Sequence, residues 1–266
     1  MLVKHIKKFN TSFKMNYRLF KVFLAIGYQS LKYRLRNRHR IAKPISMDPK
    51  DFKNEFTYRA RHLLTHYVQQ FNNAACSVAT IATILNTATE ENSHSKSKIS
   101  QQDILNTVHV LNWKERVMKR RGLQLKELAV VVEHALNAYK IKFKKFEVKY
   151  IDDHFDIETE KKNLLSKLIS LQSTENQYMI IHFNQGLFLR GLHLPHISPI
   201  GAFNTITKEI LVLDVDKYGP GPYWIPFDLF FKGISDNFGG RMSIFGYSGG
   251  GYICFTLTTP NESTNQ

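Results

Sequence analysis

The sequence predicts an α+β fold in which a helical half comes first and an antiparallel sheet follows. Apolar residues at helical spacing dominate up to residue 172, and short apolar runs typical of strands follow from Tyr178 onward. Cys76 stands at the start of the most apolar helical run, whereas His196 and Asp214 stand on two of the later strands. We therefore expect the helical half to carry the cysteine and the sheet half to carry the histidine and the aspartate.

Composition sets the size and the environment of this fold. The 266 residues are 43% hydrophobic and 12% aromatic, enough for one large domain or two small ones with a sizeable core. Cys76 and Cys254 are the two cysteines of the chain, and two cysteines make no disulfide framework. Nothing in the cysteine content therefore argues for an oxidising compartment.

The net charge of +15 is concentrated in residues 1–45, the N-terminal arm. The arm holds 12 of the 37 Lys and Arg and no Asp or Glu. The other 25 Lys and Arg and all 22 Asp and Glu lie beyond residue 45, so that part of the chain has a net charge of only +3. The body therefore has no strong electrostatic reason to bind nucleic acid.

The arm also carries an apolar stripe at helical spacing, formed by Tyr17, Phe20, Leu24, Tyr28, Leu31 and Leu35. The pattern fits a helix on an anionic membrane surface, a helix packed on the body, or a targeting signal with residues 19–28 as its apolar segment. Its densest apolar run, residues 22–26, is too short to cross a bilayer. These alternatives favour a cytoplasmic or membrane-associated protein and leave export open.

Residues 44–49 (PISMDP) mark the boundary of the main domain, which we place at 50–257, and residues 258–266 read as a disordered polar tail. The expected helices are a run from Cys76 to about Thr87, Ser100–Val110 with Ser100 and Asp103 as a capping box, Leu123–Tyr139, Asp156–Gln172 and Ile225–Ile234. The expected strands are Ile141–Tyr150 at an edge, with lysines that discourage further pairing, Met179–Phe183, His196–Phe203, Glu209–Val215 and Tyr252–Leu257. Thr87–Ser100 is expected to be a surface loop and Gly246–Gly251 a glycine-rich turn.

Cys76 is the first candidate for chemistry. At a helix N-terminus, backbone N–H groups and the helix dipole lower the pKa of a thiol toward the reactive thiolate, although an isolated cysteine is more often a buried core residue. His196 and Asp214 change that balance, because a Cys, a His and an Asp in this order supply a nucleophile, a base and an orienting acid. The 18 residues from His196 to Asp214 suffice for two antiparallel strands and a turn. Gln70, six residues before Cys76, can donate a hydrogen bond to an oxyanion.

Three stretches resemble the phytochelatin synthase family, the glutathione γ-glutamylcysteinyltransferases of the papain-like cysteine peptidase clan. They are Gln70–Cys76 with the following helix to ILN, MIIHFNQGLF (179–188) with HISPIGAFN (196–204), and ILVLDVDKYGPGPYWIPFDLFF (210–231). The resemblance covers roughly residues 52–256 and implies a papain-like fold for a single catalytic domain of the bacterial type. By position it implies Cys76 as the acylated nucleophile, His196 as general base and acid, Asp214 as the orienting residue and Gln70 as the oxyanion donor.

The resemblance also implies the substrate. Glutathione would be cleaved at its Cys-Gly bond, and the γ-glutamylcysteinyl group would pass to water or to a second glutathione to give phytochelatin. No cofactor or metal site is implied; cadmium or zinc thiolates of glutathione would be substrates or activators. The family's anionic substrate suggests Lys217, which stands where the family usually has arginine, as a carboxylate ligand without a bidentate fork.

Some residues depart from the family pattern, and other functions stay open. Ala75 and Ser77 flank the cysteine in place of the usual tyrosine and glycine, Asn72 replaces an acidic or polar residue, and the cysteine-rich C-terminal region of the plant enzymes is absent. These departures affect substrate affinity and acceptor choice, and they favour glycine removal over phytochelatin synthesis. A papain-like peptidase acting on peptides or proteins is the main alternative, and a non-enzymatic membrane-associated protein is a second.

Two further motifs have simpler interpretations than a ligand site. His193 and His196 lack further nearby ligands for zinc, and the glycines at 246–251 lack the Lys-Ser/Thr and the helix of a phosphate-binding loop. The oligomeric state, monomer or homodimer, is not specified by any pattern.

Overall fold

The computed structural model describes residues 24, 28, 31, 42–47, 58–92, 98–151, 156–189, 193–236, 247 and 249–258. Its helices are α2 (Tyr58–Thr65), α3 (Cys76–Asn92), α4 (Gln101–Thr107), α5 (Trp113–Met118), α6 (Leu125–Ala138), α7 (Ile157–Ser173), α8 (Gln185–Phe188) and α9 (Phe227–Ile234). Its strands are β1 (Lys43–Pro44), β2 (Phe143–Tyr150), β3 (Gln177–Asn184), β4 (Pro195–Asn204), β5 (Glu209–Val212), β6 (Tyr223–Pro226) and β7 (Gly251–Leu257).

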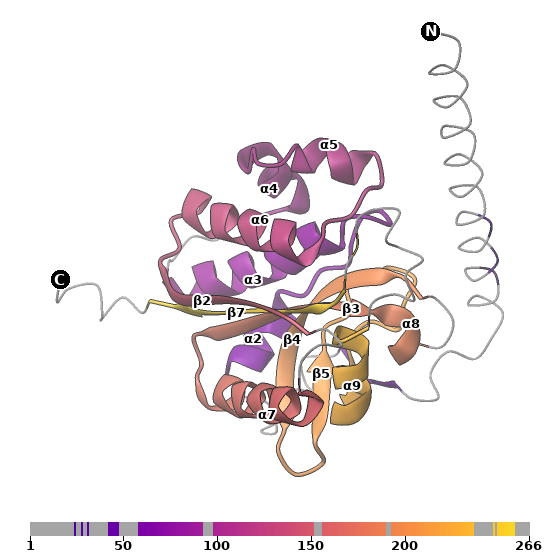
Figure 1. Cartoon of the computed structure of the whole chain (residues 1–266). Coiled ribbons are helices and arrows are strands. Elements are labelled where there is room, and N and C mark those ends of the chain that lie inside the picture. The colour runs from indigo at the N-terminus through magenta and orange to yellow at the C-terminus, as the bar shows by residue number, and fades with distance from the viewer. Residues whose placement is uncertain are drawn as a thin grey trace, which may run out of the picture.

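The strands form one antiparallel sheet in the order β1-β6-β5-β4-β3-β7-β2 (Figure 1). Sequential strands β3, β4, β5 and β6 are neighbours, whereas β7 inserts between β3 and the edge strand β2. Because β4 and β5 are antiparallel, the start of β4 and the end of β5 lie at the same end of the sheet. This arrangement brings His196, near the start of β4, close to Asp214, which follows β5.

Helices cover both faces of the sheet. Buried residues of α2, α3, α4, α5 and α6 pack with one set of strand residues, among them Ile180, Ile197 and Phe255. Buried residues of α7, α8 and α9 pack with the alternate set, among them Ile181, Phe203 and Cys254. Burial on both faces explains why β3 and β7 are apolar almost throughout instead of alternating with polar residues.

Several sequence predictions are confirmed. The α+β composition and the antiparallel sheet are as expected, and β2 is an edge strand. The capping box of α4 forms as predicted, since Ser100 accepts from the backbone N–H of Asp103 and the Asp103 side chain accepts from that of Ser100. The helices expected at 123–139 and 156–172 are α6 and α7.

The surface loop predicted for Thr87–Ser100 is wrong in its first part, because α3 continues to Asn92. Threonine and asparagine usually favour loops, since their side chains compete for backbone groups. Here the Thr87 hydroxyl and the Asn86 amide donate to carbonyls four residues earlier in the same helix, at 2.8 Å each. Thr87 and Ala88 are fully buried, so tertiary packing supports the extra turn.

Two other element boundaries were also wrong. The strand predicted for Glu209–Val215 ends at Val212, and Asp214 therefore sits in the connection that follows β5. The helix predicted for Ile225–Ile234 begins at Phe227, because residues 223–226 form the strand β6 beside β5.

Most of the N-terminal arm lies outside the described residues, as do residues 48–49 of the boundary, residues 50–57 of the main domain, residues 93–97, residues 246 and 248 of the glycine-rich turn and residues 259–266 of the tail. Of the predicted stripe, Leu24, Tyr28 and Leu31 are helical and more than half exposed. Lys43 and Pro44, the C-terminal end of that arm, pair with β6 as strand β1. Among the described residues, no helix has the length and hydropathy needed to cross a bilayer.

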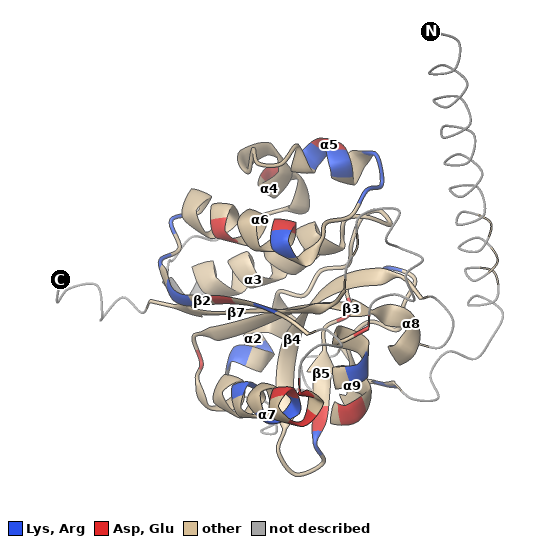
Figure 2. Cartoon of the chain, in the orientation of Figure 1, with Lys and Arg blue, Asp and Glu red and all other residues tan. Residues whose placement is uncertain are grey.

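Basic and acidic residues are interspersed along the helices and strands of the body (Figure 2). Both kinds occur on α5, α6, α7 and α9, and several form ion pairs, such as Arg116 with Glu127 and Lys149 with Glu160. This mixed surface agrees with the small net charge expected beyond residue 45.

The glycine-rich segment before β7 gives a stability prediction. A Cβ at Gly250 would lie 2.4 Å from the carbonyl oxygen of Ile234 and 2.6 Å from that of His182, both in the backbone. We expect Gly250→Ala to lower the free energy of unfolding by about 3 kcal/mol, because α9 or β3 must move away. Gly249→Ala meets no atom within 4 Å and is strained only by its φ of +150°, so it should cost about 1 kcal/mol. Urea unfolding measures both; equal costs would contradict the steric explanation.

Candidate active site

Cys76 is the first residue of α3, as the sequence predicts. Its side chain is 7% exposed and belongs to the apolar core that α3 shares with the sheet. The Thr80 hydroxyl, one turn further along α3, donates to the carbonyl of Ile197 at 3.3 Å. This contact fixes the start of α3 against β4, next to His196.

The structure brings Cys76, His196 and Asp214 together as a chain of interacting side chains. His196 Nε2 lies 2.8 Å from Asp214 Oδ1, and Cys76 is close enough to the imidazole to help raise its pKa. Because Asp214 holds Nε2, Nδ1 is the nitrogen that remains to exchange a proton with the thiol.

The electrostatics of this chain favour a protonated imidazole. Burial by itself would lower the pKa of His196, but the Asp214 carboxylate, with a smaller contribution from Cys76, raises it well above the usual value. Burial of Asp214 acts to raise its pKa, yet the charge and hydrogen bond of His196 and further donors hold it below the usual value. An imidazolium beside the sulfur is the partner that a thiolate needs.

Asp214 is fully buried and is held by more donors than His196 alone. Its Oδ1 accepts from the backbone N–H of Asp216 at 3.0 Å, and its Oδ2 accepts from the Tyr223 hydroxyl at 2.8 Å. The Gln185 amide donates to Oδ2 at 3.2 Å. A buried carboxylate with this many donors is fixed in orientation and remains ionised.

Gln70 lies in the connection that leads to Cys76, and 5% of its surface is exposed. Its backbone N–H donates to the carbonyl of Val215 at 2.8 Å, which ties this connection to the segment after Asp214. Among the described residues, its buried side-chain Oε1 has no hydrogen-bond partner. This oxygen can accept from a donor of a bound molecule, whereas an oxyanion would need the NH₂ group of the same amide.

Lys217 lies beside the same connection. Its Nζ donates to the carbonyl of Phe71 at 3.2 Å and lies 4.9 Å from the ring centre of Tyr218. The segment 214–217 thus touches three parts of the site: Asp214 holds His196, Val215 holds Gln70, and Lys217 holds Phe71. The cation predicted to meet a substrate carboxylate therefore stands at the rim of the loop that carries Gln70.

Helix α5 contacts the residues just before and just after the nucleophile. The indole N–H of Trp113, which is 1% exposed, donates to the Ser77 hydroxyl at 3.1 Å. The Asn72 side chain donates to the carbonyl of Val117 at 3.2 Å and accepts from the backbone N–H of Ala74 at 2.8 Å. Asn72 and Ser77 are two of the departures from the family pattern, and they are therefore the residues that hydrogen-bond to α5.

Cys254 is a core residue, as expected, and contrasts with Cys76. It is 3% exposed in β7, and burial raises the pKa of its thiol to about 11. The Gln177 amide donates to its sulfur at 3.4 Å. A neutral thiol in such surroundings is chemically inert.

His182, in β3, is a second buried imidazole with the opposite electrostatics. Burial lowers its pKa to about 4, and its Nδ1 lies 3.2 Å from the carbonyl of Gly249, to which it donates. The unfolded chain takes up this proton below about pH 6.5 and the folded chain only near pH 4, so stability falls as the pH drops through that window.

This difference gives a second prediction. Between pH 7 and pH 4.5, wild type should lose about 2.5 kcal/mol more stability than His182→Gln, which keeps a donor for Gly249 and has no titrating group. Urea unfolding at the two pH values measures the difference. The same loss in both proteins would show that the neutral imidazole of His182 is not a source of acid sensitivity.

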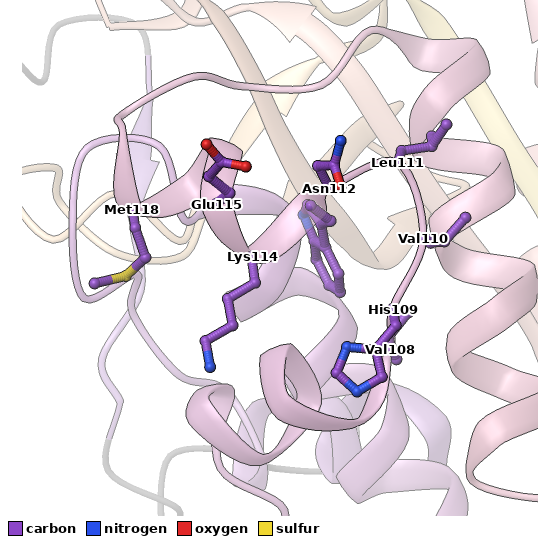
Figure 3. A pocket seen from close by; sticks show the side chains of 9 residues that line it. Val108, His109, Val110, Leu111, Asn112, Lys114, Glu115 and Met118 are labelled. Atoms are coloured by element: carbon purple, nitrogen blue, oxygen red, sulfur yellow. The ribbon is translucent and has the colours of Figure 1, made fainter.

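A cavity of about 450 Å³ opens over the connection between α4 and α5 (Figure 3). Trp113, His109, Leu111 and Met118 contribute to its lining, and Lys114, also at the cavity, donates to Asn106 at 2.8 Å. The lining holds no nucleophile paired with a base, and we assign it no reaction. Cys76, His196 and Asp214 are not among its residues.

The described residues contain no group of three or more His, Cys, Asp and Glu placed to hold a metal ion. His193 is exposed, with its Nδ1 3.1 Å from the Asn184 amide nitrogen.

Sequence reasoning missed Gln185, Asp216, Tyr223 and Trp113. Asp216 offered one signal, since it repeats the aspartate of Asp214 at a spacing of two, which points both side chains to one face of an extended segment. Gln185 offered none, because its role depends on how β3 ends beside the segment after β5.

The sequence model of the family described as "Phytochelatin synthase" matches residues 51–238, more than half of the chain. A protein of Arabidopsis thaliana named glutathione gamma-glutamylcysteinyltransferase 1 is 31% identical over 67 residues, which are 25% of this chain and 14% of that protein. Glutathione gamma-glutamylcysteinyltransferase 3 of Lotus japonicus is 29% identical over 69 residues, 26% of this chain and 14% of that protein. The matched stretches thus span about a seventh of these curated relatives.

Proposed function

Because the chain belongs to the phytochelatin synthase family, we propose that it is a glutathione γ-glutamylcysteinyltransferase and hydrolase. The observation that supports this most is the proximity of Cys76, His196 and Asp214 inside the matched residues 51–238, with His196 hydrogen-bonded to Asp214. The similarity to two proteins named glutathione gamma-glutamylcysteinyltransferase supports the choice of substrate. We also propose that the fold is papain-like, with the nucleophile on a helix and the base on the sheet.

In the proposed reaction the sulfur of Cys76 attacks the carbonyl carbon between cysteine and glycine of glutathione. The oxygen of that carbonyl takes the negative charge, and we propose the NH₂ group of Gln70 as a hydrogen-bond donor to it. His196 then gives its proton to the amine of the departing glycine, and the electron pair of the C–N bond leaves with it. The γ-glutamylcysteinyl group stays on Cys76 as a thioester.

The second half of the reaction depends on the acceptor. Water, deprotonated by His196, would give γ-glutamylcysteine, whereas the amine of a second glutathione would give phytochelatin. Glutathione carries two carboxylates, and Lys217 at the rim of the site is our candidate for one of them. Its ammonium can form a charge contact with a carboxylate but not the two parallel hydrogen bonds that an arginine forms. We therefore propose that the acceptor binds weakly and that hydrolysis dominates. Cadmium or zinc thiolates of glutathione are the proposed alternative acceptors or activators.

A papain-like peptidase would use the same three side chains on a peptide or protein. The feature that favours it is the buried thiol–imidazole pair itself, which does not depend on glutathione. The family match favours the small substrate.

The test is incubation of the purified protein with glutathione, with and without cadmium, and resolution of the thiols by mass. A Cys76→Ser variant runs alongside as the blank. Release of glycine and γ-glutamylcysteine by wild type alone is expected, and a cadmium-dependent (γ-Glu-Cys)₂-Gly peak would add synthase activity. Unchanged glutathione in every tube, together with rapid alkylation of Cys76, would reject the proposal in favour of the peptidase.

A further inference from the structure

A second buried carboxylate lies directly behind the His196–Asp214 pair. Asp216 is 6% exposed, and its Oδ1 accepts from the backbone N–H of Tyr218 at 3.0 Å. Its other oxygen, Oδ2, lies 3.2 Å from the amide nitrogen of Gln185. Two carboxylates so close together repel each other unless donors lie between them.

Gln185 supplies those donors from a different part of the fold. It is 2% exposed and follows β3 directly, with its backbone N–H donating to the carbonyl of Leu194 at 3.2 Å. Its single amide nitrogen lies 3.2 Å from Asp214 Oδ2 and 3.2 Å from Asp216 Oδ2. An NH₂ group has two hydrogens, so it can satisfy one oxygen of each carboxylate at once.

We propose that Gln185 and Asp216 are positioning residues, which act through Asp214 to hold the His196 imidazole toward Cys76. The Gln185 amide keeps the two carboxylates apart at a fixed distance, and Asp216 adds a second negative charge behind the imidazole. Asp216 also starts the turn that presents Lys217, since its carbonyl accepts from the backbone N–H of Gly219 at 3.0 Å. The cluster thus joins the proposed base to the proposed substrate cation.

The titratable groups around this cluster come from several elements. Tyr67 after α2, His196 of β4 and Tyr223 of β6 interact with the carboxylates themselves. Beyond them, Cys76 of α3 and His182 of β3 interact with His196, and Tyr247 before β7 interacts with Cys76. The Lys217 ammonium, next in sequence to Asp216, is directed to the carbonyl of Phe71. Of these groups, His196 and Tyr223 hydrogen-bond directly to the Asp214 carboxylate. His196 is the one of the two that carries a positive charge when protonated, so a change of charge at Asp216 acts first on the imidazolium.

The variants Asp216→Asn, Gln185→Met and Gln177→Met test this. The first removes a charge with almost no change of shape. The second removes both donors. The third is a control that removes a glutamine amide from the other end of β3, where it is bonded to Ser170 and Cys254. The primary measurement is the alkylation rate of Cys76 by iodoacetamide between pH 5 and pH 10, without glutathione.

In Asp216→Asn the alkaline step of the alkylation profile, where the imidazolium loses its proton, should move to lower pH by at least half a unit. In Gln185→Met the rate at pH 6 should fall about tenfold, because fewer molecules hold the imidazolium against the sulfur. Gln177→Met should keep the wild-type profile. With glutathione, kcat should fall about tenfold in both site variants while KM changes less than twofold.

A wild-type alkylation profile in Asp216→Asn would overturn the proposal. If Gln185→Met fails to fold, as judged by its thermal unfolding, Asp216→Asn decides alone. The inference rests on the proposed function only in taking Cys76 and His196 as the reacting pair. Because alkylation needs no substrate, a shifted profile with no turnover of glutathione would sustain the positioning role and reject the glutathione activity instead.

Discussion

Replacing Cys76 by alanine is expected to reduce the release of glycine from glutathione by at least about 10³-fold, to the level of the blank. The proposed thioester forms on this sulfur, and the remaining groups of the site can then only bind and polarise the substrate. The fold should survive, because alanine removes one buried atom from the start of α3. The measurement is glycine release under saturating glutathione, with circular dichroism to check the fold.

Cys254 provides the matched control. Cys254→Ala also removes one buried sulfur from the core, but from a thiol whose pKa is raised to about 11 by burial. It should keep kcat within about twofold and lose about 1 kcal/mol of stability. At pH 6, iodoacetamide followed by peptide mapping should label Cys76 and leave Cys254 unlabelled. Loss of activity in Cys254→Ala, or its retention in Cys76→Ala, would remove Cys76 from the mechanism.

Replacing Asp214 is expected to have the next largest effect, and two substitutions separate its orienting role from its charge. Asp214→Ala removes both and should lower kcat/KM by about 10²–10³-fold. Asp214→Asn keeps an oxygen that accepts from His196 Nε2, and should cost about tenfold. Both variants remove the charge that raises the pKa of His196, so the imidazolium is lost at lower pH and the alkaline limb of kcat/KM should move down.

Tyr223→Phe is the control for this series. It removes a hydrogen bond to Asp214 Oδ2 but leaves the carboxylate charge in place. Its alkaline limb should stay at or above the wild-type pH, with only a small loss of kcat. Should Asp214→Asn keep the wild-type limb, the carboxylate would not be what holds the proton on His196.

The helices and strands with a clear period were predictable from the sequence. α6 and α7 carry apolar residues at helical spacing, and the capping residues Ser100 and Asp103 are a local signal that tertiary structure did not override. The end of α3 was not predictable, because Asn86 and Thr87 lose their usual loop preference only when buried. Strand β6 was missed since its four residues run without a break into α9.

The same division holds for the site. Cys76, His196 and Asp214 were named from order and spacing, and antiparallel pairing of β4 with β5 then brings the last two together. Asp216 could have been named from its spacing of two from Asp214, but Gln185 could not, because its contact with both aspartates joins the end of β3 to the segment after β5. No rule of sequence spacing relates Gln185 to the two aspartates that its side-chain amide contacts.

The hydrogen bond between Trp113 and Ser77 also places a tryptophan, and so an intrinsic fluorophore, close to the nucleophile. The chain has two tryptophans, and Trp224 in β6 can be replaced by phenylalanine to leave the indole of Trp113 as the single emitter. Its N–H is bonded to the residue next to the nucleophile, so a group attached to Cys76 changes the surroundings of the fluorophore. Stopped-flow fluorescence with unlabelled glutathione should therefore resolve acylation as a rapid phase and deacylation as a slower return.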